Sequence, residues 1–242
     1  MRPRVGESGH VEVRPDRASR CAQRAAVIAA LACAVVVVLL GIGVAGHFGP
    51  QLRVDGAVSR ALYAGDARSA AVNGLLQVLT APGLTVFRVV VLLPVVVWLV
   101  LRRFWWTAAW VLTAIVLVGP LTTAIKELVG RMRPDFANGG ARLESLSFPS
   151  GHSSGSATLV TVVLVLTWPL VSRTGRRVCL ALGIALAVLV GLTRMWLGVH
   201  FLSDVLGGWA LGVAWTLTLA VAFGALPGGR AALPPRRRAE VG

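Results

Sequence analysis

Acidic residues are scarce in this chain of 242 residues, where ten Asp and Glu stand against 24 Lys and Arg for a formal net charge of +14. All charged residues together make up only 14% of the sequence, whereas 56% of it is hydrophobic. That balance excludes an ordinary soluble domain and is typical of a small polytopic membrane protein. The basic residues form clusters between apolar runs, so they indicate membrane topology, and we expect no nucleic-acid partner.

Cysteine is also rare, with three residues in the whole chain. Cys33 and Cys179 fall inside apolar runs, and Cys21 falls in a basic segment. Neither a disulfide framework nor a cysteine metal site is therefore expected.

Six apolar runs follow one another along the chain, and each is close to the length that crosses a bilayer as a helix. They cover residues 25–48, 84–101, 104–125, 153–171, 178–193 and 205–226. The sequence therefore predicts an all-α membrane protein, a bundle of six transmembrane helices over residues 25–226. The basic tails 1–24 and 227–242 are expected to be disordered, and the sequence leaves the oligomeric state open.

A mixed segment from Val58 to Leu79 precedes the second run. Its apolar residues have a loose helical spacing, interrupted by charged residues such as Arg60 and Asp66. This pattern favours a helix lying at the membrane interface, with an ordinary loop as the alternative.

The positions of the basic residues predict the orientation in the membrane. Fifteen of the 24 Lys and Arg lie in the two tails and in the short turns at 102–103 and 173–177. By the positive-inside rule these segments are cytoplasmic, and the loops at 49–83, 126–152 and 194–204 are outside. We therefore expect a multi-pass protein of the cell membrane with both termini in the cytoplasm.

Several basic residues lie on the expected outer side, where insertion does not favour positive charge. They belong to three polar pieces at outer span ends, which the topology places at one depth: Lys126-(six residues)-Arg133-Pro134, Pro149-Ser150-Gly151-His152, and Thr193-Arg194-(five residues)-His200-(three residues)-Asp204. Any one of these residues could be a snorkelling or interfacial side chain. However, ionisable groups at membrane depth cost roughly 2.5–3.5 kcal/mol each, so several gathered at one level indicate a functional site.

The chemistry that these residues favour is phosphoryl transfer, which depends mostly on positioning and on neutralising phosphate oxygens. Lys126, Arg133 and Arg194 would bind the phosphate, and the guanidinium groups would make directional bidentate contacts. Ser150 and the backbone N–H groups around Gly151, at the start of a new helix, would add further donors.

Two histidines would complete the site. His200 and Asp204 are four residues apart, so on a helical turn they share one face. The carboxylate could then hold one ring N–H and leave the other nitrogen of His200 free as a nucleophile. His152 would protonate the leaving alkoxide. Arg131 could add positive charge or lie at the surface, and Arg88 is expected to snorkel outward rather than face the site.

The three pieces resemble the signature of the type 2 phosphatidic acid phosphatase superfamily, K-x6-R-P, P-S-G-H and S-R-x5-H-x3-D, with Thr193 in place of the usual Ser. The resemblance covers residues 126–204 by motif and about 25–226 by layout. It implies a phosphohistidine on His200 oriented by Asp204, with His152 as general acid. It further implies phosphate binding by Lys126, Arg133 and Arg194, and chemistry without a metal or another cofactor.

The expected function is hydrolysis of a lipid phosphate or pyrophosphate at the extracytoplasmic face of the membrane. Phosphatidic acid, phosphatidylglycerol phosphate and polyprenyl pyrophosphate all fit this expectation. One alternative is a phosphotransferase that passes the phosphoryl group to an acceptor other than water. A lipid or anion transporter is a second alternative, although transporter sites usually lie nearer the bilayer midplane.

Overall fold

The computed structural model describes residues 17–65, 67–136 and 145–234, and over these ranges the protein is built from helices without strands. The described helices are α1 (Arg17–Ala45), α2 (Gly49–Leu62), α3 (Ala70–Thr80), the 3-10 turn η1 (Ala81–Gly83), α4 (Thr85–Leu101), α5 (Trp105–Val129), α6 (Gly151–Thr167), α7 (Arg173–Trp196) and α8 (Leu202–Phe223). The expected all-α fold is therefore confirmed.

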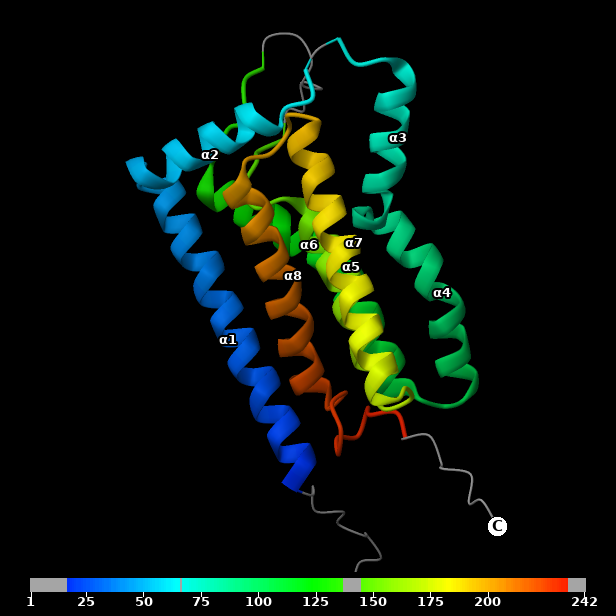
Figure 1. Cartoon of the computed structure of the whole chain (residues 1–242). Helices are drawn as coiled ribbons and strands as arrows, with labels where there is room; N and C mark the ends of the chain where they lie inside the picture. The colour runs from blue at the N-terminus through cyan, green and yellow to red at the C-terminus, as the bar shows by residue number, and fades with distance from the viewer. Residues whose placement is uncertain (1–16, 66, 137–144, 235–242) are drawn as a thin grey trace, which may run out of the picture.

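Helices α1, α4, α5, α6, α7 and α8 run along a common bundle, and α2 lies across one end of it (Figure 1). Helix α6 lies inside this bundle and packs against α5, α7 and α8. The first and last described residues lie at the opposite end from α2 (Figure 1). The described part of the chain therefore begins and ends at the same end of the bundle.

All six apolar runs are helical, but the structure does not establish six membrane spans. Helices α1, α5, α7 and α8 are long and apolar enough to cross a bilayer. The α3–η1 segment and α4 would together form a fifth span, bent by 51° at its break. Helix α6 has 17 residues and is shorter than a usual span. It can be short because neighbouring helices bury most of its first three turns.

The basic tails are more ordered than predicted. Helix α1 begins at Arg17, so residues 17–24 are helical, while residues 1–16 lie outside the described part. At the other end, Ala231 is buried in the core, and its carbonyl accepts a hydrogen bond of 2.7 Å from Thr107 Oγ1. The guanidinium group of Arg230 lies 3.8 Å from the ring centre of Trp106. The prediction of disorder is therefore wrong for 17–24 and for 227–234.

The single interfacial helix predicted over 58–79 is also wrong, because this segment contains parts of two helices. Helix α2 ends at Leu62, and α3 begins after Ser69, whose Oγ accepts a hydrogen bond of 3.3 Å from the N–H of Val72. Between them, Gly65 has a φ of 80°, a left-handed conformation that interrupts a right-handed helix. The helical spacing of the apolar residues is therefore confirmed within α2 and α3, and the chain breaks between them.

Helices α6 and α8 approach each other closely because small residues line their contact. A Cβ atom added at Gly212 would lie 2.3 Å from the Ser154 carbonyl oxygen and 2.8 Å from the Ala157 Cβ. At Gly208, one turn nearer the start of α8, an added Cβ would lie 2.6 Å from the carbonyl oxygen of Ser150. These contacts fix the start of α6 against the first turns of α8.

We predict that Gly212→Ala destabilises the protein by about 1–3 kcal/mol, since the new methyl group meets backbone that cannot move freely. The measurement is thermal unfolding of the purified protein in detergent. Gly74→Ala in α3 is the matched control, because nothing lies within 4 Å of its added Cβ. An unfolding midpoint of Gly212→Ala equal to that of Gly74→Ala would contradict this account of the contact.

Candidate active site

The residues singled out from the sequence gather at the end of the bundle that α2 crosses. Helices α5 and α7 end there and α6 and α8 begin there, joined by the segments before α6 and before α8. Helix α2 contacts both α7 and α8 at this end. The three polar pieces, separated by up to 78 positions in the sequence, are thereby brought into one region.

His200 lies just before α8 and is almost fully buried, with 2% of its side chain exposed. Its Nδ1 atom lies 3.3 Å from Asp204 Oδ2, on the first turn of α8. Asp204 is fully buried and also accepts hydrogen bonds from Ser147 Oγ at 2.7 Å and from the Phe201 N–H at 2.9 Å. Because a carboxylate only accepts, it favours the His200 tautomer with the proton on Nδ1.

The other ring nitrogen of His200 faces a cation. Its Nε2 atom lies 3.2 Å from a terminal nitrogen of Arg133. Arg133 is held by hydrogen bonds to the Val199 carbonyl at 2.8 Å and to the backbone and side chain of Ser145 at 2.7 and 2.9 Å. A phosphate bound by Arg133 would therefore sit beside the unprotonated nitrogen of His200.

Lys126 lies at the end of α5, within electrostatic range of Arg133, Arg194 and Asp204. Its Nζ atom donates hydrogen bonds to the carbonyl groups of Leu146 and Ser147, at 2.6 and 3.0 Å. These bonds anchor the segment that leads into α6 and leave a third ammonium proton to reach an anion.

Arg194, near the end of α7, is 5% exposed and has no acidic partner among the described residues. One terminal nitrogen lies 3.5 Å from Thr80 Oγ1, and its Nε has no hydrogen-bond partner in the described part of the chain. An unpaired buried guanidinium group is costly, so this side chain is suited to an anion that arrives with a ligand.

The start of α6 supplies His152 and a set of backbone N–H groups. Ser150 is the N-cap of α6, and its Oγ accepts a hydrogen bond of 3.4 Å from the Ser153 N–H, so it serves the helix in this structure. Gly151 is the first residue of α6. His152 is half-buried and interacts electrostatically with Arg194 and His200. The helix N-terminus and both histidines therefore share one region.

Arg88 departs from the sequence prediction, because it is buried at 1% exposure and does not snorkel. Its guanidinium group donates to the carbonyl groups of Gly83 at 2.6 Å and Ile115 at 3.3 Å. The same Gly83 packs against the backbone of His152, where an added Cβ would lie 2.6 Å from the carbonyl oxygen. Arg88 thus holds η1 against the first turn of α6.

Two further residues join the site in ways that the sequence did not reveal. Arg131, for which the sequence allows either a site or a surface position, bridges Asp204 at 2.8 Å and Asp55 at 2.7 Å. Asp55 lies on α2, 76 positions from Arg131 in the sequence, and no motif marks it. Residues 138–140, Arg142 and Glu144 of the same loop lie outside the described part of the chain.

Burial lowers the pKa of two site residues that lie between helices, His200 and Arg133. Burial lowers the pKa of His200 to about 3, although the hydrogen bond and charge of Asp204 oppose this effect. Arg133 and Arg194 lower the pKa of His200 further. Burial also lowers the pKa of Arg133, and the charge of Asp204 counteracts it. His200 is therefore neutral at physiological pH, as a nucleophile must be.

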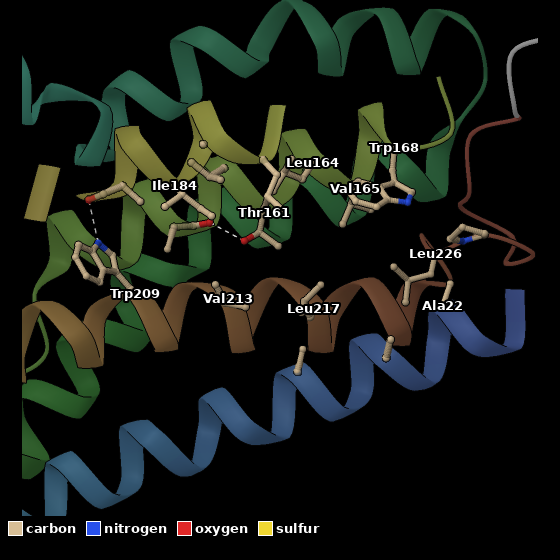
Figure 2. Close-up of a pocket in the computed structure, with 18 of the residues that line it drawn as sticks. Ala22, Thr161, Leu164, Val165, Trp168, Ile184, Trp209, Val213, Leu217 and Leu226 are labelled. Atoms are coloured by element: carbon tan, nitrogen blue, oxygen red, sulfur yellow. Dashed lines mark hydrogen bonds between the residues drawn. The ribbon is translucent and has the colours of Figure 1, made fainter. Parts of the chain in front are cut away.

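A large apolar cavity of about 690 Å³ lies away from these residues, between α1, α6, α7 and α8. Figure 2 shows it extending along α8 from Trp209 toward Leu226 and Trp168. Trp209 Nε1 donates a hydrogen bond of 3.1 Å to the Ala187 carbonyl and so links α8 to α7. None of the candidate site residues lines this cavity.

The fold and the site together define a multi-pass, all-helical membrane protein with a cationic cluster around two histidines. Comparison with known proteins gives the family. Residues 105–226 match the PAP2 superfamily, and the chain belongs to it. The predicted resemblance is therefore confirmed.

Its curated relatives include phosphatidylglycerophosphatase B of Bacillus subtilis, 45% identical over 96 residues that make up 38% of this chain and 46% of the relative. Undecaprenyl-diphosphatase of Sulfolobus acidocaldarius is 35% identical over 105 residues, 40% of this chain and 45% of the relative. The chain thus spans about half the length of the curated relatives it matches.

A solved structure extends the likeness over most of the fold. It is the crystal structure of a transmembrane PAP2-type phosphatidylglycerolphosphate phosphatase from Bacillus subtilis. The alignment has a TM-score of 0.63 and 28% identity, and it covers 78% of this chain and 93% of the other.

We predict that His200 stays neutral from neutral pH down to about pH 4, because burial favours its uncharged form. The measurement is an NMR titration of ¹³C-labelled histidine in detergent, with His200→Ala to assign the resonance. In the unfolded chain His200 would bind a proton near pH 6.5, about its reference pKa, so its burial makes folding stability fall as the pH drops below that value. A titration midpoint near 6.5 in the folded protein would contradict the prediction.

Proposed function

We propose that this protein is an integral-membrane lipid phosphatase that forms a phosphohistidine on His200. Its substrate would be a phosphomonoester or pyrophosphate of a lipid, such as phosphatidic acid, phosphatidylglycerol phosphate or polyprenyl pyrophosphate. The observation that carries the proposal is the placement of His200, with Asp204 behind Nδ1 and Arg133 in front of Nε2. The named relatives, which include a phosphatidylglycerophosphatase and an undecaprenyl-diphosphatase, support the substrate class.

In the first step, the lone pair of His200 Nε2 attacks phosphorus, and the bond from phosphorus to the leaving oxygen breaks. His152 donates its ring proton to that oxygen, so the lipid departs as an alcohol or, from a pyrophosphate, as a monophosphate. His200 keeps its Nδ1 proton and becomes positively charged. The buried carboxylate of Asp204 stabilises this charge, which is the reason for placing it at Nδ1.

In the second step, His152 accepts a proton from a water molecule, whose oxygen attacks phosphorus. The bond between phosphorus and His200 Nε2 breaks, inorganic phosphate leaves, and both histidines return to their starting states. Lys126, Arg133 and Arg194 would neutralise the equatorial oxygens in both steps, together with N–H groups at the start of α6. Ser150 would act through the helix that it caps.

The site would lie on the extracytoplasmic side of the membrane. The basic turns at 102–103 and 173–177 lie at the opposite end of the bundle, as do the first and last described residues, which continue in the sequence into basic tails. This distribution favours a cytoplasmic location for that end. A lipid substrate would then keep its chains in the outer leaflet while its phosphate reaches the cationic cluster.

We expect purified protein in detergent to release phosphate from phosphatidic acid, from a polyprenyl pyrophosphate or from both, in the presence of a chelator. His200→Ala should lose this activity by several orders of magnitude, because no nucleophile replaces the imidazole nitrogen. With a substrate labelled by ³²P in the transferred group, an alkaline quench, in which a phosphohistidine is stable, should reveal label on the wild-type protein only. Acid treatment should then remove that label, because the bond between phosphorus and a histidine nitrogen is acid-labile.

Folding of His200→Ala is checked by size-exclusion chromatography and thermal unfolding, so that a lost activity is assigned to chemistry. Label transferred to a lipid or sugar acceptor instead of water would identify a phosphotransferase. Equal phosphate release by wild type and His200→Ala would overturn the phosphohistidine route.

We further expect the orientation to be visible in cysteine labelling of intact cells. In a background with Cys33→Ala and Cys179→Ala, the exposed Cys21 near the start of α1 should react with a membrane-impermeant maleimide only after the membrane is opened. A Cys21→Ala, Ala67→Cys variant, with the new thiol in the exposed segment between α2 and α3, should react in intact cells. The reverse pattern would place the site in the cytoplasm.

A further inference from the structure

We propose that Asp55, on the crossing helix α2, is a positioning residue that acts on His200 through Arg131 and Asp204. The inference rests on the proposed function, since it assigns Asp55 a part in activating the nucleophile. Asp55 lies outside residues 105–226, which match the family, so the N-terminal part of the chain would complete the catalytic arrangement.

Asp55 is buried, with 2% of its side chain exposed, and both of its carboxylate oxygens are occupied. Its Oδ2 accepts hydrogen bonds from Arg131 at 2.7 Å and from Ser203 Oγ at 2.5 Å. Its Oδ1 accepts a hydrogen bond of 2.8 Å from the Ser203 N–H. Each contact leads to the loop after α5 or to the first turn of α8, and Asp204 is the next residue after Ser203.

Arg131 connects Asp55 to the catalytic pair. One terminal nitrogen of its guanidinium group donates to Asp55, and the other donates to Asp204 Oδ1 at 2.8 Å and to Ser203 Oγ at 2.7 Å. The guanidinium carbon lies 4.0 Å from the ring centre of Phe201, which packs against its face. Both terminal nitrogens of the guanidinium group and one face of its plane are in contact, so the Arg131 side chain is held in a single orientation.

The charges explain why two carboxylates are needed. Asp204 must remain ionised while fully buried, so that it can stabilise the positive charge formed on His200. Arg131 stabilises the ionised form of Asp204. If Asp204 were the only partner of Arg131, however, the guanidinium group would draw the negative charge of Asp204 toward itself and weaken the effect of Asp204 on His200. Asp55 shares the charge of Arg131 and so keeps Asp204 available to the histidine.

Asp55 also completes the start of α8. The N-cap residue of α8, Phe201, has an apolar side chain that cannot accept a hydrogen bond, so the first N–H groups need other partners. Asp204 accepts from the Phe201 N–H, and Asp55 accepts from that of Ser203. A carboxylate at this position is also favoured by the helix dipole. Helix α2 thereby fixes the turn of α8 that carries Asp204.

The test begins with Asp55→Asn, which keeps the size of the side chain and removes its charge. We expect kcat to fall about 10- to 100-fold, as for a small misplacement of a catalytic group, with KM changed less than about twofold, because Asp55 does not touch the phosphate. Asp135→Asn is the matched control, since it removes one exposed carboxylate from the loop after Arg133 and should leave kcat unchanged. Thermal unfolding of each variant verifies that it is folded.

A double-mutant cycle with Arg131→Met separates positioning from general stability. If Asp55 acts through Arg131, the double variant should be no slower than Arg131→Met alone, because the path is already broken. Independent effects that multiply in the double variant would overturn the proposal, as would a wild-type kcat in Asp55→Asn.

A second readout does not depend on turnover. The proton of His200 Nδ1, bonded to a carboxylate, should give a low-field NMR signal that is absent from His200→Ala. We expect Asp55→Asn to shift or broaden this signal and Asp135→Asn to leave it in place. An unchanged signal in Asp55→Asn would refute the positioning role, whether or not the wild-type protein releases phosphate. A lack of phosphate release by the wild-type protein would refute only the proposed function.

Discussion

The close contact between α6 and α8 is the constraint on which the candidate site depends. Glycines of α8 lie directly against the backbone of α6, and the Ser150 N–H donates a hydrogen bond of 2.9 Å to the Asp204 carbonyl. This contact fixes the start of α6, with His152, relative to the start of α8, with Asp204 and His200. A two-histidine mechanism requires that registration, because the nucleophile must reach phosphorus while the proton donor reaches the leaving oxygen on the opposite side of it.

Electrostatics then give the site its character. Cations outnumber carboxylates in this region, and each buried carboxylate is already engaged with Arg131 or His200. Arg194 has no acidic partner among the described residues, and Arg133 is held by neutral oxygens. An entering phosphate would therefore meet positive charge that the protein has not neutralised itself. Such preorganised charge is what phosphoryl transfer needs most.

The sequence predicted where the helices lie better than where they begin and end. It also predicted the motif residues better than the residues that hold them in place. Apolar periodicity identified each long helix, yet it missed the helical start at Arg17 and the break at Gly65, since caps and local turns carry little hydrophobic signal. The three motifs identified the residues that the structure gathers at one end. The prediction that Arg88 snorkels is wrong. Its guanidinium group donates to backbone carbonyl groups inside the bundle, and no sequence pattern reveals such partners.

The sequence by itself determined the class of molecule and the chemistry it can support. Hydrophobic runs of bilayer length indicate helices, and histidines, cations and an Asp at motif spacing predict an anion as partner. Only the tertiary structure decided that Asp55 meets Arg131, and that Arg131 meets Asp204, because these contacts join segments more than 70 positions apart. Local spacing cannot encode such pairs, since they form only when α2 crosses the end of the bundle and covers the start of α8.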